Sequence, residues 1–308
     1  MASIKSRVLI GLMRNRHLFK GRLRKETMGP DVASVLKFRE ECEKGAKRFG
    51  KVPNTVRLKQ ERINHILSEW IIPENAPEDK LLFYVHGGGY VSGSCNDHRA
   101  IVAKITVKTG LTTLLYEYGL APENPFPAAI NDSVTVYQAV LAKGYKPENT
   151  IMMGESAGGG LCLALLLALK DKNMPLPKAV VAISPWTDLS CSGESYHSKN
   201  KVSLAPLNSW TVFSRYYTGN EDVKNPHISP LFGDLAGLPP IFINAGEDDE
   251  LFDDARMYYE KAKASGVDIT FQKGEKMIHC YPLLAPLFPE ATEALNNILY
   301  FIQSKLAE

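Results

Sequence analysis

The 308-residue sequence lacks the features that mark several special classes of protein. Its 36 basic residues nearly balance its 34 acidic residues, so no overall charge indicates nucleic acid or acidic partners. No low-complexity tract is present, and no apolar run is long enough to cross a bilayer. What is present, 44% hydrophobic and 23% charged residues, is typical of a globular enzyme. We expect a cytoplasmic protein with one large domain or two small ones.

The cysteines form neither a disulfide framework nor a metal-binding pattern. They are odd in number and dispersed, with no CxxC pair: Cys42, Cys95, Cys162, Cys191 and Cys280. Such a set is typical of free thiols in a reducing compartment. The sequence shows no cluster of metal ligands either, and we expect no metal and no organic cofactor.

The first 25 residues differ from the rest in charge, with eight basic residues and no acidic one. Apolar residues recur there at helical spacing, at Val8, Leu9, Leu12 and Met13. This spacing predicts an amphipathic helix with a basic face, too short in its apolar stretch for a signal peptide. We expect the helix to pack on the body of the enzyme. Docking on an anionic membrane surface is the alternative.

From about residue 80 onward, short apolar runs alternate with helical patterns. The predicted strands are Leu81–Val85, Leu111–Tyr118, Thr150–Met153, Ala179–Ser184, Pro240–Ala245 and Ile269–Gln272. The predicted helices are Ala128–Ala142, Ala157–Lys170, Leu251–Ser265 and Ala291–Leu306. Nearly continuous apolar strands that alternate with helices predict an α/β fold, with a mostly parallel sheet covered on both faces.

Two stretches interrupt this alternation. Residues 1–50 are mostly helical and basic, and residues 188–226 are polar with a cluster of aromatic side chains. Insertions between core strands of α/β proteins often cover the active site. We therefore predict a helical cap made of both stretches, over a catalytic core made of residues 51–187 and 227–308.

A serine framed by glycines lies between a predicted strand and a predicted helix. Its surroundings, Gly154-Glu155-Ser156-Ala157-Gly158, have the G-x-S-x-G pattern of a nucleophile elbow. The serine of such an elbow occupies a sharp turn from strand to helix, where larger flanking side chains would clash. Ser156 is therefore the candidate nucleophile.

A histidine and three glycines, His86 to Gly89, directly follow the predicted strand at 81–85. Successive glycines let backbone N–H groups converge on one point, as an oxyanion hole requires. A phosphate-binding loop is the alternative, but the pattern is not G-x-G-x-x-G and no Walker Lys-Ser/Thr follows. We expect His86 to brace the loop through hydrogen bonds rather than to act as a base.

An elbow serine needs a base and an acid, in the chain order Ser, acid, His. Of the seven histidines, only His279 lies near the C-terminus, in a loop after the last predicted strand. The acid is expected in the turn after the fifth strand, where Asp248, Asp249 and Glu250 remain open. Asp253 and Asp254 belong to the following helix, where complementing the helix dipole explains them.

The motifs together resemble one known family. HGGGY at 86–90 with GESAGG at 154–159 is similar to the hormone-sensitive-lipase-like α/β-hydrolases, whose bacterial members are mostly carboxylesterases. The segment 117–129, EYGLAPENPFPAA, resembles the family's DYRLAPEHPFPAA segment. The resemblance runs from about residue 80 to the C-terminus. The departures are Glu155 and Glu117 where Asp is commoner, Gly119 for Arg and Asn124 for His.

The resemblance implies an acyl-transfer mechanism and settles the acid. The family's Asp-x-Leu-x-Asp pattern falls on residues 249–253, which implies the triad Ser156, Asp249 and His279. It further implies an oxyanion hole built from the backbone N–H groups of Gly88, Gly89 and Ala157. The supporting residues of the two motifs are His86, Gly87, Gly154, Glu155 and Gly158.

The expected function is a serine carboxylesterase that hydrolyses short- to medium-chain acyl esters through an acyl-enzyme. An aromatic cap predicts a small enclosed pocket, while lipase, deacetylase or amidase activity on the same triad is the alternative. A ligand-binding protein without turnover is disfavoured. The resemblance implies this, because the hormone receptors of this family lack the catalytic histidine, whereas this sequence has His279. The expected partner is a small-molecule ester and not nucleic acid, and a homodimer is left open.

Overall fold

The computed structural model describes residues 2–19, 21, 23–46 and 50–308. Lys20 and Arg22 of the basic N-terminal segment lie outside the described residues. The strands are β1 (Val56–Ile63), β2 (Ile66–Pro73), β3 (Leu81–Val85), β4 (Thr112–Tyr116), β5 (Thr150–Glu155), β6 (Ala179–Ile183), β7 (Ile241–Gly246) and β8 (Ile269–Gly274). The helices are α1 (Ile4–Arg14), α2 (Arg16–Phe19), α3 (Val32–Ala46), α4 (Cys95–Thr109), α5 (Ala128–Ala142), α6 (Ala157–Asp171), α7 (Ser195–Ser198), α8 (Ser209–Thr218), α9 (Phe252–Ala264) and α10 (Pro289–Ala307).

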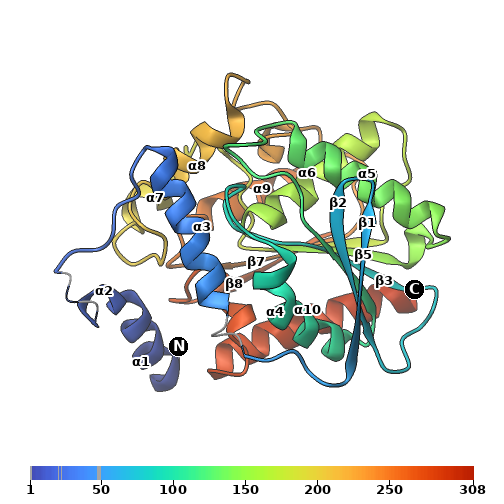
Figure 1. Cartoon of the computed structure of the whole chain (residues 1–308), viewed down its shortest axis with the longest axis horizontal. Helices are drawn as coiled ribbons and strands as arrows, with labels where there is room; N and C mark the ends of the chain where they lie inside the picture. The colour runs from blue at the N-terminus through green and yellow to red at the C-terminus, as the bar shows by residue number, and fades with distance from the viewer. Residues whose placement is uncertain (1, 20, 22, 47–49) are drawn as a thin grey trace.

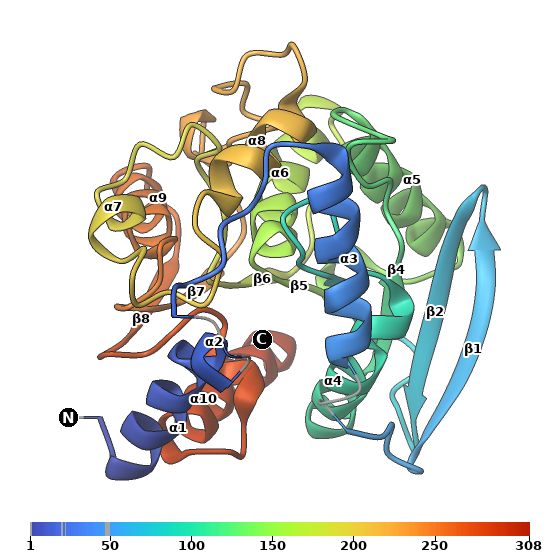
Figure 2. The ribbon, with the colours of Figure 1, turned by 60° about the vertical axis from the view of Figure 1, so that its left-hand side comes forward.

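The strands form one sheet in the order β1-β2-β4-β3-β5-β6-β7-β8. Strands β3 to β8 pair in parallel, and β1 and β2 form an antiparallel hairpin at one edge, visible in Figure 2. The mostly parallel α/β sheet predicted from the sequence is confirmed. The edge hairpin was not predicted, because β1 (VRLKQERI) is largely exposed and its sequence is too polar to show a strand pattern.

Helices cover both faces of the sheet (Figures 1 and 2). On one face α4 and α10 pack with side chains such as Leu82 and Tyr84 of β3. On the other face α5, α6 and α9 pack with Leu81, Phe83 and Val85 of the same strand. Successive residues of β3 therefore point to opposite faces, and all five are fully buried. This double burial explains why the strand reads as a continuous apolar run.

The N-terminal helix packs on the body of the enzyme, as expected, but through only part of the apolar face that the sequence suggested. Ile10 of α1 is buried among residues of the 277–294 segment, and Ser6 donates a hydrogen bond to Glu290 of α10 at 3.1 Å. Of the four apolar residues that the helical spacing picked out, Leu9 and Met13 pack against this cluster, whereas Val8 and Leu12 are about half exposed. The side of α1 that faces α10 therefore carries Ile10 with Leu9 and Met13, and Val8 and Leu12 lie outside it.

The two segments predicted to form a cap contact each other. Met28 and Leu207 form a backbone hydrogen bond of 2.8 Å, and Phe38 of α3 packs on Phe213 of α8 with ring centroids 5.0 Å apart. Tyr216 of α8 donates a hydrogen bond to the carbonyl oxygen of Pro30. The division of the chain into cap and core stays a prediction, and these contacts support treating both segments as one layer. None of the helices in the described part of the chain is long and apolar enough to span a bilayer.

Candidate active site

The candidate nucleophile lies at the junction of β5 and α6. Ser156 has φ 56° and ψ −125°, a conformation that a residue with a Cβ rarely adopts. Its backbone N–H donates to Ile183 of β6 at 2.8 Å, and its carbonyl oxygen accepts from Trp186 at 3.0 Å. The neighbouring strand and the segment that follows it therefore hold the strained turn on both sides. The sharp turn that the G-x-S-x-G pattern predicts is present.

The glycines of the elbow are required by close backbone contacts. A methyl group on Gly158 would lie 2.2 Å from the carbonyl oxygen of Val85, and one on Gly154 would lie 2.5 Å from the carbonyl oxygen of Gly158. Gly160, which the motif does not include, is as tightly placed, because a methyl group there would lie 2.0 Å from the carbonyl oxygen of Trp186. These contacts let α6 begin directly against the end of β3.

The loop after β3 passes beside the nucleophile. A methyl group on Gly87 would lie 3.2 Å from Cβ of Ser156, so the two backbones are in near contact. Gly88 and Gly89 have φ of 120° and 66°, which other residues rarely adopt. Among the described residues, nothing accepts a hydrogen bond from the backbone N–H groups of Gly88, Gly89 or Ala157. These groups are free to donate to an anion near Ser156.

The candidate base and acid come from the loops after β8 and β7. Nδ1 of His279 lies 2.7 Å from Oδ2 of Asp249, whose side chain is fully buried. The other carboxylate oxygen of Asp249 accepts the backbone N–H of Leu251 at 3.1 Å. Burial by itself lowers the pKa of His279, but the Asp249 carboxylate and the neighbouring Cys280 outweigh it and raise the pKa well above its usual value.

The other acids of this turn point elsewhere. Asp248 forms ion pairs with Arg14 of α1 at 2.5 Å and with Lys199 at 3.4 Å. The buried Glu250 makes no ion pair with a described residue, and burial raises its pKa. Of the three acids that the sequence left open, the structure brings Asp249 to His279.

The two acids at the start of α9 do more than the sequence indicated. They lie in the first turn, as expected, but a carboxylate oxygen of Asp254 also accepts the backbone N–H groups of Thr187 and Asp188, at 2.9 and 2.8 Å. Asp253 similarly accepts the N–H of Ser195 at 2.9 Å. The helix-dipole explanation was therefore incomplete, since these acids fasten the 188–226 insertion to the core.

A buried charge network under the elbow was missed from the sequence. Oε1 of Glu155 accepts the backbone N–H of Gly87 at 2.6 Å and lies 2.9 Å from Nε2 of His98. Oε2 accepts the hydroxyl of Tyr84 at 2.5 Å, and Nδ1 of His98 bonds Asp97. Burial lowers the pKa of His98, but the two carboxylates outweigh it and raise the pKa to about 10. His98 is therefore an imidazolium held between two carboxylates at neutral pH.

This network joins the two glycine motifs. Glu155 precedes the nucleophile, and its carboxylate holds the first glycine of the loop that carries Gly88 and Gly89. The longer acidic side chain that stands where Asp is commoner makes this bond here. The signal that could have revealed His98 is Ser94-x-x-Asp97, which forms a capping box at the start of α4 and aims the next residue at the elbow.

His86 braces the loop, and its surroundings disfavour a role as base. Nδ1 lies 2.8 Å from the carbonyl oxygen of Gly87, and the ring stacks on Tyr118 with centroids 4.3 Å apart. The hydroxyl of Tyr118 donates to the carbonyl oxygen of His86 at 2.9 Å. Burial, with the charged His98 nearby, lowers the pKa of His86 to about 4. Its ring is therefore neutral, and it is fixed by stacking and hydrogen bonding.

Aromatic rings line the path from the insertion to the candidate base. Trp210 of α8 lies edge-on to His279, with ring centroids 5.7 Å apart, and it also contacts Trp186 at 5.1 Å. Phe213 of α8 is so close to Gly89 that a methyl group there would lie 2.5 Å from its ring. All three aromatic side chains are buried. They pack against the candidate base and against the glycine loop.

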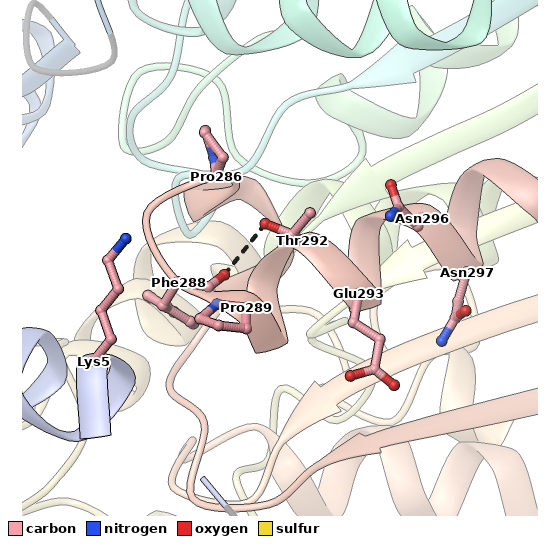
Figure 3. A pocket seen from close by; sticks show the side chains of 8 residues that line it. All are labelled: Lys5, Pro286, Phe288, Pro289, Thr292, Glu293, Asn296 and Asn297. Atoms are coloured by element: carbon pink, nitrogen blue, oxygen red, sulfur yellow. Dashed lines mark hydrogen bonds between the residues drawn. The ribbon is translucent and has the colours of Figure 1, made fainter. Parts of the chain in front are cut away.

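Figure 3 shows an open pocket that is separate from these residues. It has a volume of about 620 Å³ and is lined by Lys5 of α1 and by side chains from residues 286–297 at the start of α10. None of the candidate catalytic side chains lines it. We place no step of the chemistry there.

The sequence and the fold match known hydrolases. A family described as having the alpha/beta hydrolase fold matches residues 82–283. An acetyl-hydrolase of Streptomyces hygroscopicus is 36% identical over 248 residues, which cover 80% of this chain and 82% of that protein. An esterase of Acinetobacter venetianus is 34% identical over 252 residues, which cover 81% and 83%.

Solved structures agree with this relationship. The esterase EstE5, in crystals soaked with p-nitrophenyl butyrate, superposes with a TM-score of 0.91 at 33% identity over the whole of both chains. An esterase of the bacterial hormone-sensitive lipase family superposes with a TM-score of 0.88 at 33% identity over 99% of both chains. The chain therefore belongs to the α/β-hydrolase family, within its hormone-sensitive-lipase-like group of carboxylic ester hydrolases.

Proposed function

We propose that this hydrolase cleaves short- to medium-chain acyl esters with Ser156 as nucleophile, His279 as base and Asp249 as the acid that orients it. The observation that carries the proposal is the 2.7 Å contact between Nδ1 of His279 and Oδ2 of Asp249. These two residues lie on the loops after β8 and β7, and Ser156 has the strained conformation of an elbow nucleophile. In an elbow of this kind the imidazole takes the serine proton while the serine oxygen attacks the ester carbonyl.

The oxyanion of the tetrahedral intermediate would be held by the free N–H groups of Gly88, Gly89 and Ala157. Backbone donors that are fixed in advance stabilise this charge without reorganisation, and one such donor typically contributes about 10²–10³-fold in rate. The protonated His279 then gives its proton to the leaving alcohol. Water attacks the acyl-enzyme with the same base, and the free carboxylic acid leaves.

The aromatic side chains support a small acyl group. Trp186, Trp210 and Phe213 are buried and contact one another or the loop glycines, so a long acyl chain would have to displace them. The soaked p-nitrophenyl butyrate of EstE5 is an ester of this size, in a structure of similar fold. The substrate class is therefore a small-molecule ester with an acetyl- to butyryl-sized acid.

Hydrolysis of p-nitrophenyl acetate, butyrate, octanoate and dodecanoate tests the proposal. We expect kcat/KM to be highest for the two shorter esters, and Ser156→Ala to lower kcat by roughly 10⁴–10⁶-fold. Ser198→Ala, an exposed serine of α7, serves as the matched control and should leave kcat within about twofold. Undiminished hydrolysis by Ser156→Ala would refute the assignment, and a dodecanoate preference would refute the acyl-size argument alone.

A further inference from the structure

The outer side of α1 carries apolar side chains that nothing in the described chain covers. Ile4, Val8 and Leu12 are 79%, 56% and 49% exposed, and their spacing of four residues places them on one face of the helix. Phe19 and Leu23, which follow α1, are 72% and 92% exposed. With Leu18, these residues make up half of the exposed large apolar side chains among the described residues. Solvent-exposed apolar side chains gathered in this way mark a binding surface.

The position of this face is fixed by the opposite side of the helix. Ile10 is buried against the start of α10, and Ser6 bonds Glu290. Figures 1 and 2 both show α1 and α2 at the edge of the molecule beside α10. The helix is therefore held by its other side, and the face formed by Ile4, Val8 and Leu12 stays exposed.

The charged side chains that α1 itself carries beside the face are all cationic. All 34 acidic residues of the chain lie beyond residue 25, whereas eight of its 36 basic residues lie within the first 25. Lys5 and Arg7 lie one position from Ile4 and Val8, and at 100° per residue they fall on either side of the apolar stripe. Neither side chain forms an ion pair with another described residue. Their charges are available to an anionic partner.

We propose that this face, formed by Ile4, Val8 and Leu12 with the flanking Lys5 and Arg7, docks the enzyme on an anionic lipid surface. A helix with apolar side chains and flanking cations lies in the plane of a bilayer, with the apolar residues among the acyl chains and the cations at the headgroups. A second copy of the chain fits less well. A symmetric contact would bring the two cationic segments together, and like charges would oppose it.

Docking through α1 would bring the candidate site close to the lipid surface. Arg14 of the same helix bonds Asp248, next to the candidate acid, and Arg16 donates to the carbonyl oxygen of Leu204 at 2.7 Å, just before α8. Helix α1 is therefore fastened to the acid loop, and α2, which follows it, is fastened to the segment before α8. Esters dissolved in the bilayer would meet the enzyme on this side.

Sedimentation with lipid vesicles tests the proposal in the full-length enzyme. We expect binding to phosphatidylcholine vesicles that contain phosphatidylglycerol, weak binding to pure phosphatidylcholine, and loss of binding at high salt. Lys5→Gln with Arg7→Gln should weaken binding to anionic vesicles roughly 30-fold. Ile4→Ser, Val8→Ser and Leu12→Ser together should weaken it by about tenfold or more.

Matched controls use an equivalent pair and an equivalent exposed apolar residue on the edge strand β1. Arg57→Gln with Lys59→Gln, and Leu58→Ser, should bind vesicles as the wild type does, and every variant should hydrolyse a water-soluble ester at the wild-type rate. Vesicle binding that is absent, indifferent to lipid charge, or unchanged in the α1 variants overturns the proposal. A dimer in light scattering that the α1 variants break, without vesicle binding, assigns the face to a second copy and also overturns it.

Discussion

Helices α6 and α1 both contain glycine, but α6 is almost entirely buried and α1 is largely exposed. In α6, every residue from Ala157 to Leu169 is buried, and Gly158 and Gly160 near its start make contacts that no side chain would permit. In α1 only Ser6 and Ile10 are buried, and nothing lies within 4 Å of a methyl group placed on Gly11.

The difference in burial agrees with the different positions of the two helices in the fold. A helix that is apolar on all sides belongs in the interior, and α6 carries the elbow at the end where the sheet and the glycine loop meet it. A helix with one buried side and an exposed apolar stripe, as α1 is, agrees with the docking proposed above. Two comparisons between these regions, and a third at the charge network under the elbow, test this contrast.

The largest effect is expected at the two adjacent acids that serve the two regions. Asp249→Asn should lower kcat by about 10⁴-fold, because the imidazole loses the carboxylate that fixes its tautomer. It should also lower the pKa of His279, since Asp249 raises it, and move the acidic limb of the kcat/KM profile to lower pH. Asp248→Asn, which loses the Arg14 pair, should change kcat only a few-fold. An equal loss in both variants would break the assignment of the acid.

The next effect is on stability, at one glycine in each helix. Gly160→Ala should lower the free energy of unfolding by about 3 kcal/mol, because the added methyl group would lie 2.0 Å from the carbonyl oxygen of Trp186. Gly11→Ala should raise the free energy of unfolding by about 0.5–1 kcal/mol if α1 unfolds together with the rest of the protein. Alanine favours a helix more than glycine does, and its methyl group would have no atom within 4 Å. Urea denaturation followed by circular dichroism measures both. Similar values for the two variants would remove the contrast between the helices.

The smallest effect concerns the imidazolium under the elbow. The folded-state pKa of His98, about 10, lies above that of an unfolded histidine, so its contribution is complete below about pH 6.5 and is lost as pH rises through 10. In the wild type, the free energy of unfolding should therefore fall as pH rises between those limits. We expect this fall to be smaller in His98→Gln, by on the order of 2 kcal/mol.

The control for this effect is His65, which is also next to a carboxylate, 3.0 Å from Asp132, but is 76% exposed. His65→Gln should leave the slope nearly unchanged, because water screens an exposed pair. Assays across the same pH range should show kcat lowered in His98→Gln with KM kept, because Glu155 then holds Gly87 less firmly. A slope identical to the wild type would show that the network carries no charge.

The fold was predictable because its signals are local. Helix Ala128–Ala142 begins and ends as predicted, and the ends of the parallel strands differ from the prediction by only one or two residues. Strand β1 was missed because an edge strand has one partner and keeps polar side chains, and β2, although buried between β1 and β4, was not predicted either. For α1 the prediction was right for Leu9 and Met13 and wrong for Val8 and Leu12, because all four are apolar and only the position of α10 separates them.

The sequence by itself determined the parallel part of the sheet, the strained Ser156 and the glycine loop. Each of these depends on residue types at short, set spacings, where a side chain either fits the backbone or does not. The residue pattern alone left three acids open, the family resemblance implied Asp249, and the tertiary structure brings Asp249 to His279. Only the tertiary structure decided that His98 lies under the elbow and which face of α1 stays open. Some of these contacts are between residues 30 or more positions apart in the sequence. Others distinguish residues of the same type that lie only a few positions apart. Both therefore depend on where whole helices and strands pack.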